Sequence, residues 1–217
     1  MSIYTGVNGT AKKATAIYAG VNGTARKIVR AYAGDENGVA QLVYQRRVYL
    51  FRDGVSDDTL TGGWTGTIQY KTGGGTNYTM YRMTNDGAAL SGSMSGTGSQ
   101  ERCVYVRSGA VDVTGYRRLV MRIGWTASGL GSASYNLWNM IYGLARPGVT
   151  NVSSNTDSTL CAVYGGIELA ANRSELGYED YALDISALSG TYNVALYKGQ
   201  ADLKGTLNVS LNRVWLE

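Results

Sequence analysis

The chain has 217 residues, of which 30 are Gly and 17 are Tyr, and it carries a formal net charge of +4 with no His. Charged residues make up only 17% of the sequence, so the chain lacks the high charge that is typical of disordered proteins. No apolar run approaches the roughly 18 residues that cross a bilayer. The lack of His removes the usual general base, zinc ligand and triad partner, which disfavours an enzyme. Abundant Gly, Thr, Ser and Tyr favour short strands joined by tight turns, so we predict an all-β protein.

An internal repeat opens the chain. Residues 3–13 read Ile-Tyr-Thr-Gly-Val-Asn-Gly-Thr-Ala-Lys-Lys and residues 17–27 read Ile-Tyr-Ala-Gly-Val-Asn-Gly-Thr-Ala-Arg-Lys, so the period is 14 residues. A looser third copy at 31–40 has one residue inserted before its Asn-Gly. Asn-Gly is the strongest short-range signal for a β-hairpin because both positions tolerate a positive φ, and every copy contains it.

The spacing of these turns sets the length of the expected strands. About ten residues separate successive turns, as in the stretch 24–34, which is long enough for one strand of about 33 Å. The repeat therefore predicts strand–turn–strand units over residues 1–48, as repeated β-hairpins in a β-meander or a fibrous β-spiral. Few large apolar side chains lie here, so the segment must stack on copies of itself, on the next domain or on other subunits. We expect a homo-oligomer, and a homotrimer by analogy with other fibrous β stems.

Basic side chains are concentrated in the same segment. Those that we predict to contact a partner follow the repeat rather than forming one cluster: Lys12, Lys13, Arg26, Lys27 and Arg30. This spacing favours a docking surface for an acidic partner, or a solvated strand face, over a nucleic-acid site.

From Tyr49 onward the chain changes to alternation of apolar and polar residues, bounded by turns rich in Gly, Ser and Asn. The alternating segments lie at 102–106, 119–125, 192–197 and 207–216. No stretch shows a sustained helical period, although 112–116 and 184–190 look like single helical turns. Regularly spaced short strands over this length predict a jelly-roll β-sandwich over residues 49–217.

Two phrases resemble a pattern found in carbohydrate-binding-module-like jelly-rolls: Val-Asp-Val-Thr-Gly-Tyr-Arg-Arg-Leu at 111–119 and Leu-Asp-Ile-Ser-Ala-Leu-Ser-Gly-Thr-Tyr at 183–192. The Val-Asn-Gly-Thr-Ala-Arg-Lys repeat is similar to those at the front of structural proteins in phages of Gram-positive gut bacteria. In those proteins a segment like Thr-Gly-Gly-Trp at 61–64 and a terminal jelly-roll follow. The resemblance covers nearly the whole chain and implies a virion component, although a fold does not by itself establish function.

Aromatic side chains are the best candidates for a ligand-binding face, because the C–H faces of sugars stack on aromatic rings while polar neighbours fix the hydroxyls. The residues predicted to contact a ligand are Trp64, Tyr135, Trp138 and Tyr142. Trp64 and Trp138 are flanked by Gly, Thr and Asn, which favours a place near the surface, while a place in the core stays open for both.

One loop gathers three carboxylates, Asp53, Asp57 and Asp58, which could hold a structural Ca²⁺ through oxygen ligands. The resemblance to carbohydrate-binding jelly-rolls, which often carry such an ion, implies one here. The spacing departs from the EF-hand pattern, however, and plain turn chemistry is the favoured interpretation. No other cofactor is expected. Cys103 and Cys161 lack metal-ligand spacing and are expected to be reduced structural residues, with a disulfide as the alternative.

Carboxylates are the remaining catalytic option, because glycoside hydrolysis uses two of them about 5–10 Å apart. The candidates are Asp57, Asp58, Glu168, Glu175, Glu179 and Asp180. Nothing in their spacing distinguishes them from turn residues that accept hydrogen bonds from backbone N–H groups. We therefore expect no enzyme, and a polysaccharide depolymerase is the weaker alternative.

Together with these patterns, the resemblance implies a bacteriophage virion structural protein, and we expect a tail-fibre or spike subunit whose jelly-roll touches a host-surface glycan. The alternative is a capsid-decoration or head-fibre protein that grips the shell through its basic repeat. The expected partners are other virion proteins, with no membrane insertion. The opening residues, Met1 to Gly6, show no basic patch leading into an apolar stretch, so we expect no secretory signal and assembly into the virion in the host cytoplasm.

Overall fold

The computed structural model describes residues 4–7, 10–13, 18–21, 24–27, 30–34, 40–45, 47–56, 63–64, 69–71, 78–97, 101–130, 139–148, 151–153, 161–170, 172–200 and 204–217. All regular structure in these ranges is β-strand, so the all-β prediction is confirmed. No helix long and apolar enough to cross a membrane occurs in them. The chain forms two compact units, Met1–Val48 with Glu217, and Tyr49–Leu216.

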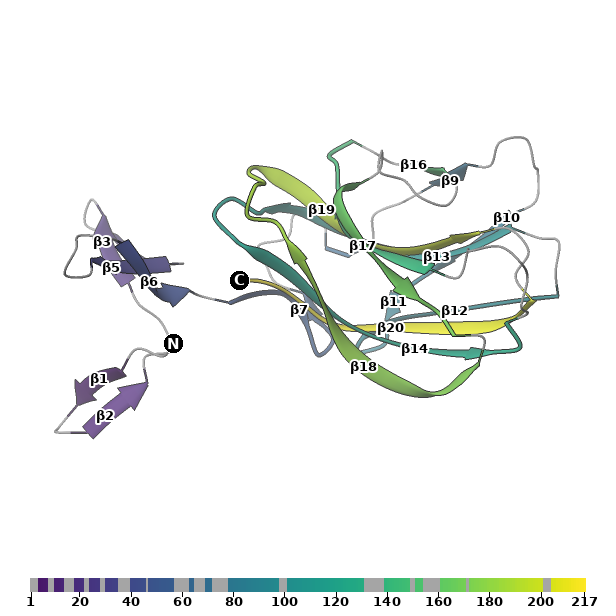
Figure 1. The fold of residues 1–217 in the computed structure, drawn as a ribbon, viewed down its shortest axis with the longest axis horizontal. Coiled ribbons are helices and arrows are strands. Elements are labelled where there is room, and N and C mark those ends of the chain that lie inside the picture. The colour runs from purple at the N-terminus through teal and green to yellow at the C-terminus, as the bar shows by residue number, and fades with distance from the viewer. Residues whose placement is uncertain are drawn as a thin grey trace. The chain divides into compact units, whose positions relative to one another are not determined.

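The first unit shows three β-hairpins in the part that the structure describes, each a two-stranded antiparallel sheet (Figure 1). They pair β1 (Tyr4–Val7) with β2 (Thr10–Lys13), β3 (Tyr18–Val21) with β4 (Thr24–Lys27), and β5 (Arg30–Gly34) with β6 (Ala40–Gln45). In the first two, the innermost pair joins the residues that flank Asn-Gly, for example Val7 and Thr10, as a two-residue turn requires. The prediction of repeated hairpins is confirmed.

The arrangement of these strands differs from the expectation in one respect. The stretch 24–34, predicted as one long strand, is divided between β4 and β5, which belong to different hairpins. Each hairpin pairs locally across its own turn because loop closure costs least there. The repeat is therefore a repeat of equivalent hairpins, with Lys13 opposite Tyr4 in the first and Lys27 opposite Tyr18 in the second.

The second unit is a sandwich of two sheets (Figure 1). The five-stranded sheet has the order β10 (Tyr78–Arg82), β13 (Glu101–Asp112), β19 (Thr191–Gln200), β15 (Asn139–Ala145), β17 (Cys161–Glu168). The seven-stranded sheet has the order β11 (Thr84–Asn85), β12 (Leu90–Thr97), β20 (Lys204–Leu216), β14 (Arg118–Ser128), β18 (Arg173–Asp184), and β7 (Val48–Arg52) pairs with β20 and β8 (Val55–Ser56). A separate parallel pair joins β9 (Gln69–Lys71) and β16 (Asn151–Ser153).

From β12 onward the chain crosses between the sheets as in a jelly-roll. Strands β12, β14, β18 and β20 lie in the seven-stranded sheet, whereas β13, β15, β17 and β19 lie in the five-stranded sheet. Neighbours within a sheet are thus far apart in sequence, such as β12 with β20 and β13 with β19, as two interlocked Greek keys require. This strand order confirms the predicted jelly-roll sandwich.

The core of the sandwich lies between the two sheets and follows from the alternation along each strand. On β14, Leu119, Met121 and Ile123 are fully buried, whereas the intervening Arg122 is partly exposed. The five-stranded sheet contributes side chains buried to the same degree: Met140, Leu144, Val194 and Leu196. These apolar residues fix the two sheets against each other.

The two phrases that resemble carbohydrate-binding jelly-rolls are turns that contact one another. Asp112 Oδ1 accepts a hydrogen bond from the Thr114 N–H at 2.9 Å, and Asp184 Oδ1 accepts one from the Ser186 N–H at 2.9 Å. The Val113 N–H then donates to a carbonyl of the second phrase at 3.0 Å. Both are strand-ending Asx turns, so the expected single helical turns are wrong and their carboxylates act as turn-stabilising acceptors.

The two cysteines lie on strands that are not neighbours. Cys103 is on β13, and the buried Cys161 is on β17, with β19 and β15 between them. Three strand spacings of about 4.8 Å each therefore separate the two positions along the sheet, whereas a disulfide needs Cα atoms within about 7 Å. The sheet order favours the predicted structural thiols over a disulfide.

Candidate functional site

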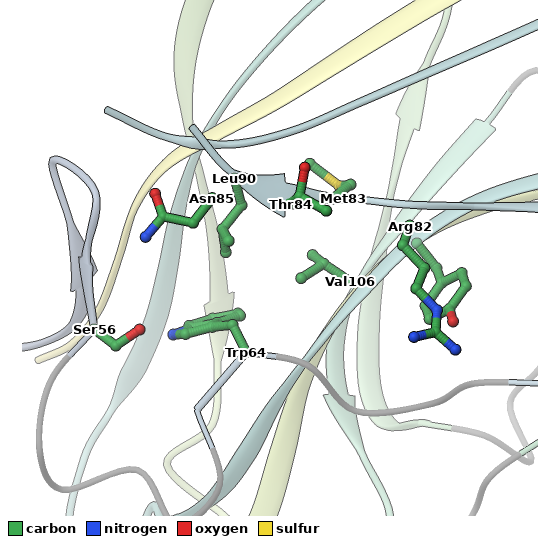
Figure 2. A pocket seen from close by; sticks show the side chains of 9 residues that line it. Ser56, Trp64, Arg82, Met83, Thr84, Asn85, Leu90 and Val106 are labelled. Carbon is green, nitrogen blue, oxygen red and sulfur yellow. The ribbon is translucent and has the colours of Figure 1, made fainter. Parts of the chain in front are cut away.

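A cavity of about 330 Å³ opens where the chain passes from β10 in one sheet to β11 in the other (Figure 2). Apolar and polar side chains line it together: Ser56, Trp64, Arg82, Met83, Thr84, Asn85, Leu90, Tyr105 and Val106. We name this set the Trp64 cavity. Its volume falls at the lower end of the range for small-molecule sites, about 300–1,000 Å³.

Trp64 forms one wall and is held in place by the core. Its side chain is buried, its Nε1 donates to the carbonyl of Leu50 at 3.2 Å, and its ring meets Phe51 edge-on at a centroid distance of 5.8 Å. Figure 2 shows the indole on one side of the cavity with Leu90 and Val106 across from it. Because its N–H is used within the protein, the indole offers the cavity only its apolar ring.

One rim of the cavity consists of two turns that hold each other. Asn85 Nδ2 donates to the Gly54 carbonyl at 2.6 Å, and Asn85 Oδ1 accepts from the Gly87 N–H at 2.9 Å. Gly54 has a φ of +81°, and a Cβ there would collide with the backbone of Gly87, so the turns approach as closely as only glycine allows. Asp86 accepts two N–H groups of its own turn, and these hydrogen bonds lower its pKa. The rim is therefore fixed before a ligand arrives.

Arg82 and Tyr105 are register partners across the parallel strands β10 and β13, and both line the cavity. Tyr105 is only 2% exposed, and its phenolic oxygen has no hydrogen-bond partner among the described residues. Arg82 is exposed, and the lining residues in the described part of the chain include no carboxylate. The cavity is thus lined by a guanidinium without a counter-charge among the described residues, next to a tyrosine whose unpartnered hydroxyl is buried.

The arrangement suits a small ring with one apolar face and several hydrogen-bonding groups. The indole and the aliphatic side chains opposite it supply dispersion contacts, while the hydroxyls of Ser56 and Thr84 can donate or accept. The described lining holds no carboxylate, thiol or imidazole that could act as a nucleophile or general base. These residues can bind such a ring, and they carry no evident group for reacting with it.

A second group of aromatic and charged side chains lies on β14, β15 and β18 and is named the Trp125 cluster: Trp125, Tyr142, Arg173, Glu179 and Tyr181. The Arg173 guanidinium lies 4.5 Å from the centre of the Trp125 ring and donates to Glu179 Oε1 at 3.5 Å. Tyr181 donates to Glu179 Oε2 at 2.9 Å, and its ring lies 5.6 Å from that of Tyr142. Each charge of this cluster has an opposite charge beside it.

The tyrosines of the Trp125 cluster are held in their neutral form. Burial, reinforced by the hydrogen bond and charge of Glu179, raises the pKa of Tyr181 to about 12. Burial also raises the pKa of Tyr142. The buried Trp125 N–H lies close enough to Tyr181 to favour its phenolate slightly, but outside hydrogen-bonding geometry. Both phenols therefore remain protonated at physiological pH.

The structure separates the predicted ligand contacts. Trp64 lines the cavity but is buried, so it is a wall and not an exposed platform. Tyr142 is also buried, and it belongs to the Trp125 cluster, so these two residues do not form one face. Tyr135 and Trp138 lie outside the described residues.

The predicted calcium ligands are only partly described. Asp53 lies in the turn between β7 and β8 with a φ of +51°, and Arg213 donates to its carboxylate at 3.1 Å. Asp57 and Asp58 lie outside the described residues. Within the described ranges no three metal-ligating side chains come together. Calcium binding stays a prediction, and arginine already neutralises one of its three proposed carboxylates.

The predicted partner-binding residues all lie on hairpin strands of the first unit. Lys12 and Lys13 are on β2, Arg26 and Lys27 on β4, and Arg30 on β5. The structure thus places all five residues on hairpin strands and describes only their backbone.

Four of the six carboxylates considered for catalysis lie in the described part of the chain, and Asp57 and Asp58 lie outside it. Glu179 and Asp180 are successive strand residues on opposite faces, with Glu179 in the Trp125 cluster and Asp180 paired with Arg122 at 3.1 Å. Glu168 and Glu175 are exposed. Hydrogen bonds from hydroxyl and N–H groups of their own turns lower the pKa values of three carboxyl groups, opposite to the shift of a general acid: Asp86, Asp112 and Asp184.

Of the nine described lining residues only Trp64 was predicted as a ligand contact, and Arg82, Thr84 and Tyr105 are among those that were not. The one local signal near them is Asn85-Asp86-Gly87, which is typical of a tight turn. It predicts a turn between β11 and β12, but not the packing of that turn against the turn at Gly54. The cavity depends on this long-range contact, so no local pattern could have located it.

No protein-family profile and no curated protein matches the sequence. Among solved structures, the glycoside hydrolase domain of Endo-D (Spr0440) from Streptococcus pneumoniae R6 is similar over 63% of this chain, with 15% sequence identity and a TM-score of 0.37. This chain spans 19% of that one. A likeness of this extent identifies neither a shared fold nor a shared activity.

Proposed function

We propose that the second unit is a glycan-binding module, and that the chain is a host-surface-binding subunit of a bacteriophage tail fibre or spike. The observation that carries the proposal is the Trp64 cavity, in which an indole wall faces aliphatic side chains and the rim carries hydroxyl, amide and guanidinium groups. A pyranose ring has the matching character, with C–H groups on its faces and hydroxyls around its edge.

The rigidity of the site supports recognition. Trp64 is tied to the Leu50 carbonyl, and the Asn85 turn is tied to the Gly54 turn. These parts of the described lining are therefore preformed, which lowers the entropic cost of association. A single preformed site of this size fits one sugar residue of a longer chain, and higher avidity would come from several copies of the subunit.

The virion part of the proposal rests on the N-terminal repeat and its resemblance to repeats of phage structural proteins. The described hairpins are two-stranded, and such hairpins are marginal on their own in water. Stacking of equivalent hairpins from several chains is a direct way to stabilise them, as in a fibre stem. The solution mass of the full-length protein tests this part, since a stem predicts an oligomer.

A glycan array with the full-length protein tests the binding part. The variant Thr84→Tyr places a large side chain at the exposed rim of the cavity, and Ser93→Tyr places the same side chain at an exposed position of β12 outside it. We expect the wild type and Ser93→Tyr to bind glycan. Thr84→Tyr should bind at least about tenfold more weakly, because the ligand loses its polar contact with the rim. Equal binding by all three, or binding by none, contradicts the proposal.

A second candidate, a capsid-decoration or head-fibre protein, is favoured by one observation. Basic residues recur at the same register in the first two hairpins, Lys12 with Arg26 and Lys13 with Lys27, as a surface for a regular acidic shell would require. Labelling of the protein on intact particles separates the candidates. A label at the tail tip removes the decoration hypothesis, and a label over the head removes the tail-fibre hypothesis.

A further inference from the structure

The Trp64 cavity carries a positive charge that the described part of the protein does not neutralise. Among the described lining residues Arg82 is the one that carries a charge. The carboxylates in the two rim turns are engaged elsewhere: Asp86 accepts the Ser91 hydroxyl and two N–H groups, and Asp53 binds Arg213. No carboxylate of the described residues thus competes with a ligand for the guanidinium.

Tyr105 lies beside Arg82 in register on the adjacent strand and also lines the cavity. Its hydroxyl oxygen is fully buried, so Tyr105 forms part of the wall and does not offer a donor to a ligand. Arg82 is therefore the group that would bind an anionic part of a ligand.

We propose that the ligand of the Trp64 cavity is an acidic sugar residue, whose anionic group is bound by Arg82 while its ring lies against Trp64. Guanidinium forks bind carboxylates and phosphates through two parallel hydrogen bonds, and charge-assisted bonds of this kind are the strong ones. The apolar wall opposite requires a ring with a C–H face, so a simple inorganic anion satisfies only half of the site. This inference rests on the glycan-binding function proposed above and specifies its substrate class.

The direct experiment is calorimetric titration of the full-length protein with three ligands that share one ring and differ at one carbon: D-glucuronate, glucose 6-phosphate and D-glucose. We expect at least one of the two acids to bind at least tenfold more tightly than D-glucose, in line with the strength of charge-assisted hydrogen bonds. Preference for D-glucuronate assigns a carboxylate, and preference for glucose 6-phosphate assigns a phosphorylated sugar.

Two variants test the named residues against one control. Arg82→Gln should weaken binding of the preferred acid about ten- to a hundredfold and leave D-glucose unaffected. Tyr105→Phe keeps the ring and removes a buried hydroxyl without a partner, so it should change neither affinity and should not lower the free energy of unfolding. The control, Arg146→Gln, removes an exposed arginine outside the cavity and should change neither affinity.

The outcomes separate the inference from the function on which it rests. Equal affinity for D-glucose and both acids, or an Arg82→Gln variant that keeps the preference, overturns the acidic-sugar inference. Binding of neutral oligosaccharides alone on the array also overturns it while leaving glycan binding intact. Failure to bind any glycan, acidic or neutral, overturns the proposed function itself.

Discussion

The Trp64 cavity and the Trp125 cluster are built from the same kinds of side chain and differ in how those side chains are satisfied. Each combines a buried tryptophan with an arginine and at least one tyrosine. In the Trp125 cluster the arginine stacks on the indole and binds Glu179, and Tyr181 donates to the same carboxylate. In the cavity the arginine has no counter-charge among the described residues, and the tyrosine hydroxyl has no partner.

The comparison shows that residue type alone does not identify a binding site. A closed network of hydrogen bonds stabilises the fold and leaves little for a ligand to gain, because any new contact must replace an existing one. Donors that the protein leaves unsatisfied next to a cavity gain the full benefit of a ligand acceptor. The Trp125 N–H is one exception within the cluster, because it is buried without a hydrogen-bond partner. The ring that carries it is covered by Arg173.

The largest expected effect concerns the wall of the cavity. Trp64→Ala removes a buried indole and its hydrogen bond to the Leu50 carbonyl, and should lower the free energy of unfolding by about 3–5 kcal/mol. Trp64→Phe, which keeps most of the apolar volume, should cost less. Urea denaturation measures both, and a loss below about 1 kcal/mol for Trp64→Ala would show that the indole is not part of the core.

The two arginines should differ in their contribution to stability. Arg173→Ala uncovers the Trp125 ring and leaves Glu179 without its arginine, so we expect a loss of about 1–2 kcal/mol. Arg82→Ala should change stability by less than about 0.5 kcal/mol, because the side chain is exposed and makes no ion pair in the described part of the chain. Equal losses of unfolding free energy in the two variants would contradict the claim that Arg173 stabilises the fold and Arg82 does not.

Alkaline pH should act on the Trp125 cluster. The pKa of Tyr181 is raised from 10.0 to about 12, so the folded state holds this proton more tightly than the unfolded chain. The stability that this provides is complete below pH 10 and is lost as the pH rises through 12. Unfolding curves between these pH values should show a decline that is weaker in Tyr181→Phe, and an unchanged decline in that variant would assign it to other groups.

The smallest expected effects concern the turn carboxylates. Asp86→Ala and Asp112→Ala should each lower the free energy of unfolding by about 0.5–1 kcal/mol at neutral pH through lost turn hydrogen bonds. Because the pKa values of both carboxyl groups are lowered in the folded state, this stability is present above 3.8, the ordinary pKa of aspartate, and is lost as the pH falls below it. Only Asp86→Ala, at the cavity rim, should also weaken glycan binding, and weakening by Asp112→Ala would contradict that assignment.

The sequence predicted the fold better than the site. Asn-Gly at fixed spacing specifies hairpins, and alternation such as that of Leu119, Met121 and Ile123 specifies sandwich strands, because both are local consequences of backbone geometry. The jelly-roll sandwich was predicted from the regular spacing of short strands over the length of the second unit. Strand length in the repeat was overestimated, since nothing in the stretch 24–34 marks where one hairpin ends and the next begins.

The site depends on contacts between residues that are far apart in sequence. Trp64 was predicted as a ligand contact, but its partner Leu50 and the opposing Val106 come from strands of different sheets. Arg82 and Tyr105 meet through a parallel pairing that has no local signature. Whether a tryptophan or arginine is satisfied by its neighbours is decided by tertiary packing, so the cavity and the cluster could not be distinguished from residue types and spacing alone.

The most direct test of the central claim is the NMR spectrum of the indole N–H groups of full-length protein during titration with the acidic sugar that calorimetry selects. The chain has four tryptophans, so the signals can be assigned by substitution with Phe one at a time. We predict that the Trp64 signal moves with saturation while the Trp125 signal stays in place, and that Arg82→Gln abolishes the movement. Movement of the Trp125 signal with an unchanged Trp64 signal would contradict the account and move the binding site to the Trp125 cluster.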